Sequence, residues 1–155
     1  MSDRGAVLIA NRGEIAIRIA RTCRQLGFPT VAVYSDADRF SSHAKICDRA
    51  YWIGAAPPRE SYLNADRIIA VAKAAGARFV HPGYGFLSEN EDFAREVARA
   101  GLVFVGPSPE SIELMGDKVQ ARRTVDALGI PRVPGSEGAV ATAGEAREIA
   151  SKIGY

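Results

Sequence analysis

The fold is decided first by the stretch Ala6-Val7-Leu8-Ile9-Ala10-Asn11-Arg12-Gly13-Glu14. Its five consecutive apolar residues predict a buried strand, and the polar residues and glycine after them predict a turn into a helix. Four further short apolar runs follow, at residues 30–34, 50–53, 78–80 and 102–105. Each is continuous rather than alternating, which is typical of buried parallel strands covered on both faces.

The segments between these runs have the period of amphipathic helices. The apolar side chains of residues 14–26 recur at intervals of three or four and share one face; they are Ile15, Ile19, Cys23 and Leu26. Residues 64–75 repeat the pattern, and Ser88-x-x-Glu91 predicts a capping box that opens a third helix. Each helix is followed by a glycine suited to end it: Gly27, Gly76 and Gly101. This alternation predicts an α/β fold with a parallel sheet.

The sequence changes character after Val105. Gly106-Pro107-Ser108-Pro109 predicts a connection, and helices are expected at residues 109–115, 117–128 and 142–153. No strand-rich region follows, so these last helices have no second sheet to cover. We therefore expect them to open a second domain.

The composition is that of a folded globular protein. The 155 residues are 47% hydrophobic and 25% charged, and 20 Lys and Arg against 18 Asp and Glu leave a net charge of +2, which excludes a nucleic-acid-binding tail. No apolar run reaches the ~18 residues of a membrane span, and no signal peptide precedes the first strand, so we expect a cytoplasmic protein. Cys23 and Cys47 lack the spacing of a zinc site or a disulfide framework and are expected to be small hydrophobic residues.

The loop Asn11-Arg12-Gly13-Glu14 lies where the first strand meets the first helix, at the edge where open α/β sheets bind ligands. A dinucleotide fingerprint needs G-x-G-x-x-G, and this loop supplies only Gly13, so a nicotinamide dehydrogenase is disfavoured. Asp36 stands 23 residues after Gly13, where a ribose-binding acid would stand. Without the other glycines, Asp36 is expected only to cap or turn the chain.

A second loop, His81-Pro82-Gly83-Tyr84-Gly85, follows the fourth strand at the same edge of the sheet. Its glycines and proline predict a sharp and rigid backbone path. Two interpretations stay open: a platform that presents the ring of Tyr84 to a bound group, or a tight turn in which His81 is hydrogen-bonded to the backbone. Glu89 follows at the start of the next helix. His43 has no motif around it and is expected on the surface or as a cap.

The segment Gly116-Asp117-Lys118 begins another predicted helix, with Asp117-x-x-Gln120 as its N-capping pair. A lysine at a helix N-terminus opposes the macrodipole unless an anion lies there, and a phosphate would be stabilised by Lys118 and by free N–H groups. The alternative is an ordinary surface lysine, because G-x-x-x-x-G-K-[ST] is absent. Arg122 and Arg123 are expected on a solvated face.

Four motifs, in this order and at this spacing, resemble a single family. They are Val7-Leu8-Ile9-Ala10-Asn11-Arg12-Gly13-Glu14-Ile15-Ala16, His81-Pro82-Gly83-Tyr84-Gly85-Phe86-Leu87-Ser88-Glu89-Asn90, Met115-Gly116-Asp117-Lys118 and Val133-Pro134-Gly135-Ser136. Together they resemble the N-terminal part of biotin carboxylase, and the resemblance covers essentially the whole chain. It implies a Rossmann-like pre-ATP-grasp domain over residues 1–115, which includes a helical linker, and the incomplete start of an ATP-grasp domain over residues 116–155.

The resemblance also implies a reaction and its participants. ATP and bicarbonate would give a carboxyphosphate intermediate, which carboxylates biotin on a carrier protein or domain, and Mg²⁺ or Mn²⁺ would accompany the nucleotide. A carboxyltransferase would be the further partner, and the full-length protein would be a homodimer. The acyl acceptor stays open among acetyl-CoA, propionyl-CoA, methylcrotonyl-CoA and pyruvate.

Particular residues take roles through the same resemblance. Lys118 would contact ATP, and Tyr84 and Gly85 would line the biotin pocket. Arg21 would lie at the dimer interface, where Gln25 replaces an acid that some members carry. The wall of the active site would be formed by His81, Gly83, Glu89, Asn11, Arg12, Gly13 and Glu14.

The resemblance assigns no catalytic residue and no metal ligand to these 155 residues. The family's glycine-rich lid, metal-binding glutamates, bicarbonate-binding arginine and general base all lie beyond Tyr155. We therefore expect this chain to fold through at least Gly106 but to be inactive alone. A free-standing, non-catalytic binding or oligomerisation module with the same fold is the alternative.

Overall fold

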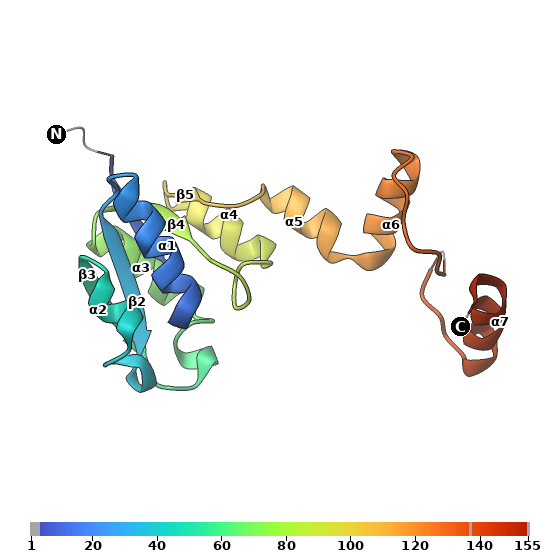
Figure 1. The fold of residues 1–155 in the computed structure, drawn as a ribbon, viewed down its shortest axis with the longest axis horizontal. Coiled ribbons are helices and arrows are strands. Elements are labelled where there is room, and N and C mark those ends of the chain that lie inside the picture. Colours follow the sequence, from blue (N-terminus) through green and yellow to red (C-terminus); the bar gives the residue numbers. More distant parts are fainter. Residues whose placement is uncertain (1–3, 137, 155) are drawn as a thin grey trace. The chain divides into compact units, whose positions relative to one another are not determined.

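The computed structural model describes residues 4–136 and 138–154, and the chain divides into two compact units, Met1–Pro109 and Glu110–Tyr155 (Figure 1). The first unit is built on a five-stranded parallel sheet in the order β3-β2-β1-β4-β5. The strands are β1 (Ala6–Ile9), β2 (Thr30–Ser35), β3 (Arg49–Gly54), β4 (Ala77–His81) and β5 (Val103–Phe104). The predicted α/β fold with a parallel sheet is therefore confirmed.

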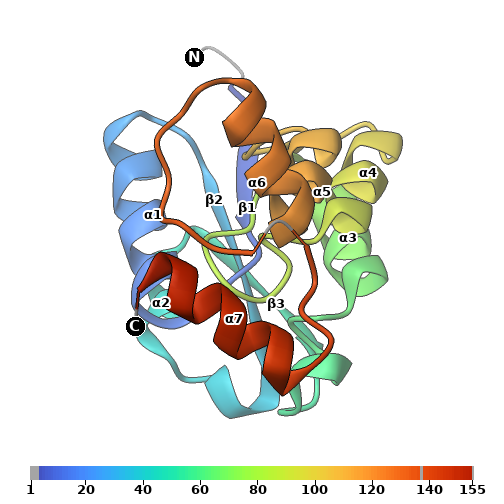
Figure 2. The ribbon, with the colours of Figure 1, turned by 90° about the vertical axis from the view of Figure 1, so that its right-hand side faces the viewer.

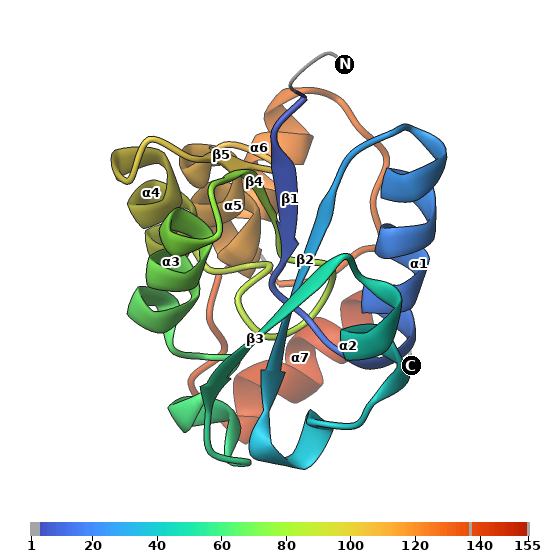
Figure 3. The ribbon, with the colours of Figure 1, turned by 90° about the vertical axis from the view of Figure 1, so that its left-hand side faces the viewer.

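Helices cover both faces of this sheet (Figures 2 and 3). On one side lie α1 (Gly13–Gln25) and α2 (Ser42–Ile46), and on the other lie α3 (Ala65–Ala74) and α4 (Glu91–Arg99). Successive residues of β1 point to opposite faces, so Leu8 joins the core beneath α3 and α4, whereas Ile9 joins the core beneath α1. Each helix buries its apolar stripe against the sheet.

The central strands are buried, but the edge strands are not. Every residue of β1 is buried, whereas in β3 only Ile53 and Gly54 are buried, and neither residue of β5 is. The prediction that all five runs form buried strands is therefore wrong for the two edges. An edge strand has a neighbour on one side only, and the helices do not extend fully over it. Both cysteines are buried and unpaired, as predicted.

The cap of α4 differs from the prediction. Asn90, not Ser88, is the N-cap, and its Oδ1 accepts the Phe93 N–H at 2.7 Å. Ser88 lies in the preceding turn, where its own N–H donates to the Gly85 carbonyl at 2.9 Å. The Ser88-x-x-Glu91 capping box is therefore wrong, because the turn after Gly85 uses two more residues before the helix can start. The three helix-ending glycines all have positive φ, as predicted.

The second unit is helical. It contains α6 (Lys118–Ala127), capped by Asp117, and α7 (Ala143–Ile153), capped by Thr142, while α5 (Pro109–Gly116) begins at the boundary between the units. The three helices predicted after Gly106 are therefore present. The division into domains at residues 115 and 116 stays a prediction. Across the described residues, no helix combines the length and the apolar character that crossing a membrane requires.

We predict that Gly54→Ala destabilises the first unit by about 3 kcal/mol or more. Gly54 has φ +137°, and a Cβ placed there would lie 1.9 Å from the Glu60 carbonyl oxygen, so the end of β3 would have to move. Urea unfolding monitored by circular dichroism measures the change.

Gly76→Ala is the matched control, because Gly76 also has a positive φ, of +61°, but a Cβ added to it would meet no other atom within 4 Å. It should cost only the left-handed strain, about 1–2 kcal/mol. If both variants lost the same free energy of unfolding, the contact with Glu60 would not constrain Gly54.

Candidate functional site

Two loops meet at the carboxyl edge of the sheet, the one after β1 and the one after β4. Asn11 joins them: its side chain is buried, and its Nδ2 donates to the carbonyl oxygens of Pro82 at 2.7 Å and Tyr84 at 2.8 Å. Its Oδ1 accepts the Arg12 N–H at 2.9 Å. One amide therefore satisfies backbone groups of both loops and holds them in contact.

Gly83 lets the second loop pass close to Asn11. It has φ +69°, and a Cβ at this position would lie 2.8 Å from Asn11 Nδ2 and 3.2 Å from the Ile15 side chain. Its N–H donates to His81 Nδ1 at 3.1 Å. Burial lowers the pKa of His81, which favours the neutral ring that this bond requires. The interpretation of His81 as a backbone-bonded residue of a tight turn is therefore confirmed.

Tyr84 is presented outward from this turn, with 60% of its surface exposed. Its hydroxyl donates to the Glu14 carboxylate, and this hydrogen bond raises the pKa of Tyr84. Both residues line a cavity of about 390 Å³ together with Asn11, Arg12, Gly13, Ile15, Gly85 and Phe86. The tight turn thus leaves the Tyr84 ring exposed next to this cavity, and its role as a platform for a bound group stays a prediction.

Arg12 lines this cavity and also contacts a second group of side chains. Its Nη1 lies 3.2 Å from Asp38 Oδ2, and its guanidinium lies 5.6 Å from the Tyr62 ring centroid and 5.8 Å from that of Phe86. Burial would raise the pKa of Asp38, but hydrogen bonds from Tyr62, Arg12 and Ser35 outweigh it and lower that pKa. Asp38 is therefore held as a carboxylate next to the first loop.

His43 is the positioning group that sequence analysis missed. Its ring is fully buried, with Nε2 3.1 Å from the Val33 carbonyl oxygen and Nδ1 accepting the Gly13 N–H over a long 3.4 Å. Since Nε2 faces a carbonyl, it carries the proton, which leaves Nδ1 free to accept. The predicted surface position is wrong. The alternative of a cap is correct, although the helix that it caps is α1, whose N-cap residue Arg12 makes no side-chain capping bond.

Two other predicted residues lie outside this cavity. Glu89 is exposed in the turn before α4 and is not among the residues that line the cavity. Asp36 begins a short 3₁₀ turn and accepts the Trp52 indole N–H at 2.8 Å. The interpretation of Asp36 as a turn residue is therefore confirmed.

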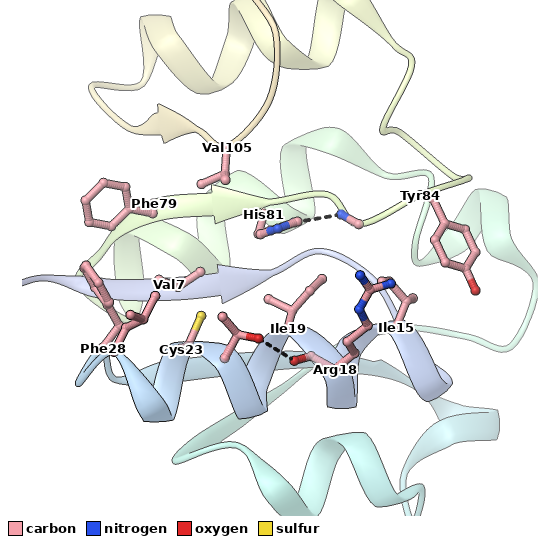
Figure 4. Close-up of a pocket in the computed structure, with 13 residues that line it drawn as sticks. Val7, Ile15, Arg18, Ile19, Cys23, Phe28, Phe79, His81, Tyr84 and Val105 are labelled. Carbon is pink, nitrogen blue, oxygen red and sulfur yellow. Dashed lines mark hydrogen bonds between the residues drawn. The ribbon is translucent and has the colours of Figure 1, made fainter.

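A larger groove of about 520 Å³ lies between α1 and the strands β1 and β4, next to Val105, which follows β5 (Figure 4). Ile15, Ile19 and Cys23 of α1 line one side of it, and Phe79 and His81 of β4 line the other. The lining is mainly apolar, and Arg18 and Tyr84 stand at one end. Arg21 is exposed on α1 and does not line the groove.

Lys118 belongs to the second unit and is exposed at the first position of α6. The expectation of free N–H groups there is wrong in part, because Asp117 Oδ1 accepts the N–H groups of Val119 at 2.8 Å and Gln120 at 3.0 Å. Lys118 and Arg122 nevertheless line one cavity of about 350 Å³.

Arg122 is not simply solvated, contrary to expectation. Its Nη1 donates to the Ser136 carbonyl at 2.9 Å and thereby ties α6 to the segment that follows it. Arg123, its neighbour, is exposed as predicted. Within the described ranges, no three His, Cys, Asp or Glu side chains gather as a metal site would require.

We predict that Asn11→Ala destabilises the first unit by ~2–3 kcal/mol, because it leaves the Pro82 and Tyr84 carbonyl groups without their donor. Amide hydrogen exchange should accelerate at residues 83–86. Asn64→Ala is the control: it removes an exposed helix cap and should cost ~1 kcal/mol, with no effect on that loop. Unchanged exchange at residues 83–86 in Asn11→Ala would contradict the linking role.

We also predict that the free energy of unfolding declines as the pH falls below about 6.5. The folded state lowers the pKa of His81 from the ordinary 6.5, so below that pH the unfolded chain binds a proton that the folded chain does not. His81→Asn keeps an acceptor for the Gly83 N–H and does not titrate. Denaturant unfolding between pH 7 and pH 5 should show a steeper decline for the wild type than for this variant, and parallel declines would oppose the assignment.

Several curated proteins and solved structures that this chain resembles are carboxylases. It is 55% identical over 149 residues to a biotin carboxylase of Halalkalibacterium halodurans, covering 96% of this chain and 33% of that protein. It is also 53% identical over 150 residues to the Haemophilus influenzae biotin carboxylase, covering 96% of this chain and 34% of that protein. This chain thus spans about one third of the length of these relatives.

A crystal structure gives the same result. The biotin carboxylase domain dimer of the Hydrogenobacter thermophilus 2-oxoglutarate carboxylase, in complex with MgADP, ADP and bicarbonate, aligns with a TM-score of 0.88 at 48% identity, over 97% of this chain and 33% of that one. The family model described as biotin carboxylase, N-terminal domain, matches residues 4–112, the whole α/β unit. The chain therefore belongs to the biotin carboxylase N-terminal domain family.

Proposed function

We propose that this chain serves as the N-terminal part of a biotin carboxylase, the ligase that uses ATP and bicarbonate to carboxylate biotin on a carrier protein through carboxyphosphate. The observation that carries the proposal is the exposed Tyr84 on a rigid loop over a cavity, in a chain of this family. The relative of known structure binds MgADP and bicarbonate, which supports the nucleotide and the one-carbon substrate.

The first unit would supply one wall of the biotin site. Tyr84 and Gly85 would contact the bicyclic ring system of biotin, because an aromatic face next to exposed backbone suits a ligand that is part apolar and part amide. Asn11 and Gly83 would set the position of that wall without touching the ligand, since both are committed to the contact between the loops. His81, Arg12, Gly13, Glu14 and Glu89 would form its surroundings.

Lys118 would contact the phosphate groups of ATP. Asp117 occupies the nearest helix N–H groups, so the lysine ammonium, together with Arg122 in the same cavity, would provide the attraction for an anion. The described residues do not fit a magnesium or manganese site, so no step is assigned to a metal held by this chain.

The described residues of this chain would bind and orient ligands, and none of them is placed to move a proton or to stabilise a transferring phosphoryl group alone. The remaining chemistry would come from segments that correspond to the rest of the relatives' length. Arg21 would lie at a homodimer interface, and a carrier protein and a carboxyltransferase would be the partners, in the cytoplasm.

The test uses a chimaera in which this chain replaces the aligned region of the Haemophilus influenzae biotin carboxylase, beside the 155-residue chain alone. We expect biotin-dependent ATP turnover from the chimaera and none from the isolated chain. In the chimaera, Lys118→Gln should raise the KM for ATP about 10- to 100-fold, as expected for a lost charge-assisted hydrogen bond.

Lys73→Gln, an exposed lysine in the last turn of α3, is the matched control and should leave the KM for ATP unchanged. A folded but inactive chimaera would contradict the proposed function. Turnover by the isolated chain would instead show that the catalytic groups lie within these residues.

A further inference from the structure

Phe86 has a backbone conformation that its side chain disfavours. Among the residues that the structure describes, it is the only one other than glycine with a positive φ, at +44°. For a bulky L-residue this conformation is sterically unfavourable and persists only where the surroundings enforce it. Phe86 follows the Gly83-Tyr84-Gly85 turn, so its conformation helps to decide where that turn lies.

Tyr62 provides the enforcing contact. Its ring stacks on that of Phe86, with centroids 5.0 Å apart and 15° between the planes. Tyr62 is itself 1% exposed, and both roles of its hydroxyl are used: it donates to Asp38 Oδ2 at 2.8 Å and accepts the Ser35 N–H at 3.2 Å. The ring on which Phe86 lies is therefore fixed at its far end.

Arg12, in the loop after β1, contacts both of these rings. Its guanidinium lies 5.6 Å from one ring centroid and 5.8 Å from the other, and it pairs with the same Asp38 oxygen that accepts the Tyr62 hydroxyl. The group thus combines residues that follow four different strands: Arg12 after β1, Asp38 after β2, Tyr62 after β3 and Phe86 after β4. Asn11 holds the same loop nearer its start, where its side chain donates to the carbonyl oxygens of Pro82 and Tyr84.

We propose that Tyr62 is a positioning residue for Tyr84: by stacking on Phe86 it stabilises the left-handed backbone there and so fixes where the Tyr84 ring stands over the cavity. The link to biotin rests on the proposed function, whereas the link to the loop does not. Asn11 and Tyr62 therefore constrain the 83–86 segment at its two ends. The Tyr84 ring between them is exposed, and its hydroxyl is bonded to Glu14.

The first measurement uses nuclear magnetic resonance on the 155-residue chain and does not depend on activity. A positive φ gives a strong intraresidue NOE between the amide and α protons of Phe86. Tyr62→Phe keeps the ring and should keep this signal, whereas Tyr62→Leu should lose it and should shift the Tyr84 ring resonances. If Phe86 keeps its signal in a folded Tyr62→Leu variant, the proposal is overturned.

Two further variants separate positioning from stability. Phe104→Leu disrupts the T-shaped Phe93–Phe104 pair of the same core and should leave the Phe86 signal intact. Should Tyr62→Leu fail to fold, Phe86→Gly provides the test, because glycine adopts the positive φ without strain but has no ring to hold. Faster amide exchange at residues 83–86 in Phe86→Gly supports the proposal, and unchanged exchange there overturns it.

The second measurement uses the chimaera. Tyr62→Leu should raise the KM for biotin about fivefold to tenfold, as for the loss of one aromatic pair, and should leave the KM for ATP within twofold. Combined with Phe86→Gly, it should have little further effect, because the two act through one contact. If the KM for biotin and the KM for ATP rose equally in Tyr62→Leu, Tyr62 would have a structural role only. The same would hold if the effects of Tyr62→Leu and Phe86→Gly on the KM for biotin were additive. A changed Phe86 signal with an unchanged KM for biotin would instead contradict the biotin role of Tyr84, and with it the proposed function of this loop.

Discussion

The buried amide of Asn11 is the interaction on which the carboxyl edge of this protein depends. It is 3% exposed and bonds to backbone groups of the loop after β4, 71 and 73 residues further along the chain, as well as to the next residue of its own loop. A buried amide without partners would cost several kcal/mol, so the two loops cannot separate without a large penalty. The adjacency of β1 and β4 in the sheet brings the loops together, and Asn11 fixes their contact.

That constraint explains where strain is tolerated. Gly83 and Gly85 take positive φ at no steric cost, but Phe86 does so as well and needs the stacked Tyr62 ring and the Arg12 guanidinium to remain there. Rigid backbone of this kind suits a site that must present one side chain in one place, because less conformational freedom is then lost on binding. The exposed Tyr84 ring is the part of the loop left to meet a ligand.

The proposed roles are divided between the two units. The proposed biotin wall lies in the α/β unit, and Lys118, which we propose contacts ATP, lies in the helical unit that follows. Neither proposed set includes a group assigned to catalysis, and both would orient ligands and provide a few charges. The chain spans about one third of the length of its relatives.

The sequence by itself determined the alternation of strands with α1, α3 and α4, the glycines that end these three helices, and the family, because these depend on local periodicity and short motifs. It could not decide which polar groups meet across long separations. Only the tertiary structure placed His43 beneath the Gly13 N–H, 30 residues away in sequence, and Tyr62 against Asp38 and Phe86. It also decided that Asn90 rather than Ser88 caps α4, and that Asp117 occupies the N–H groups next to Lys118. The physical reason is that hydrogen-bond partners and ring contacts are chosen by packing in three dimensions, whereas periodicity constrains only neighbours along one helix or strand.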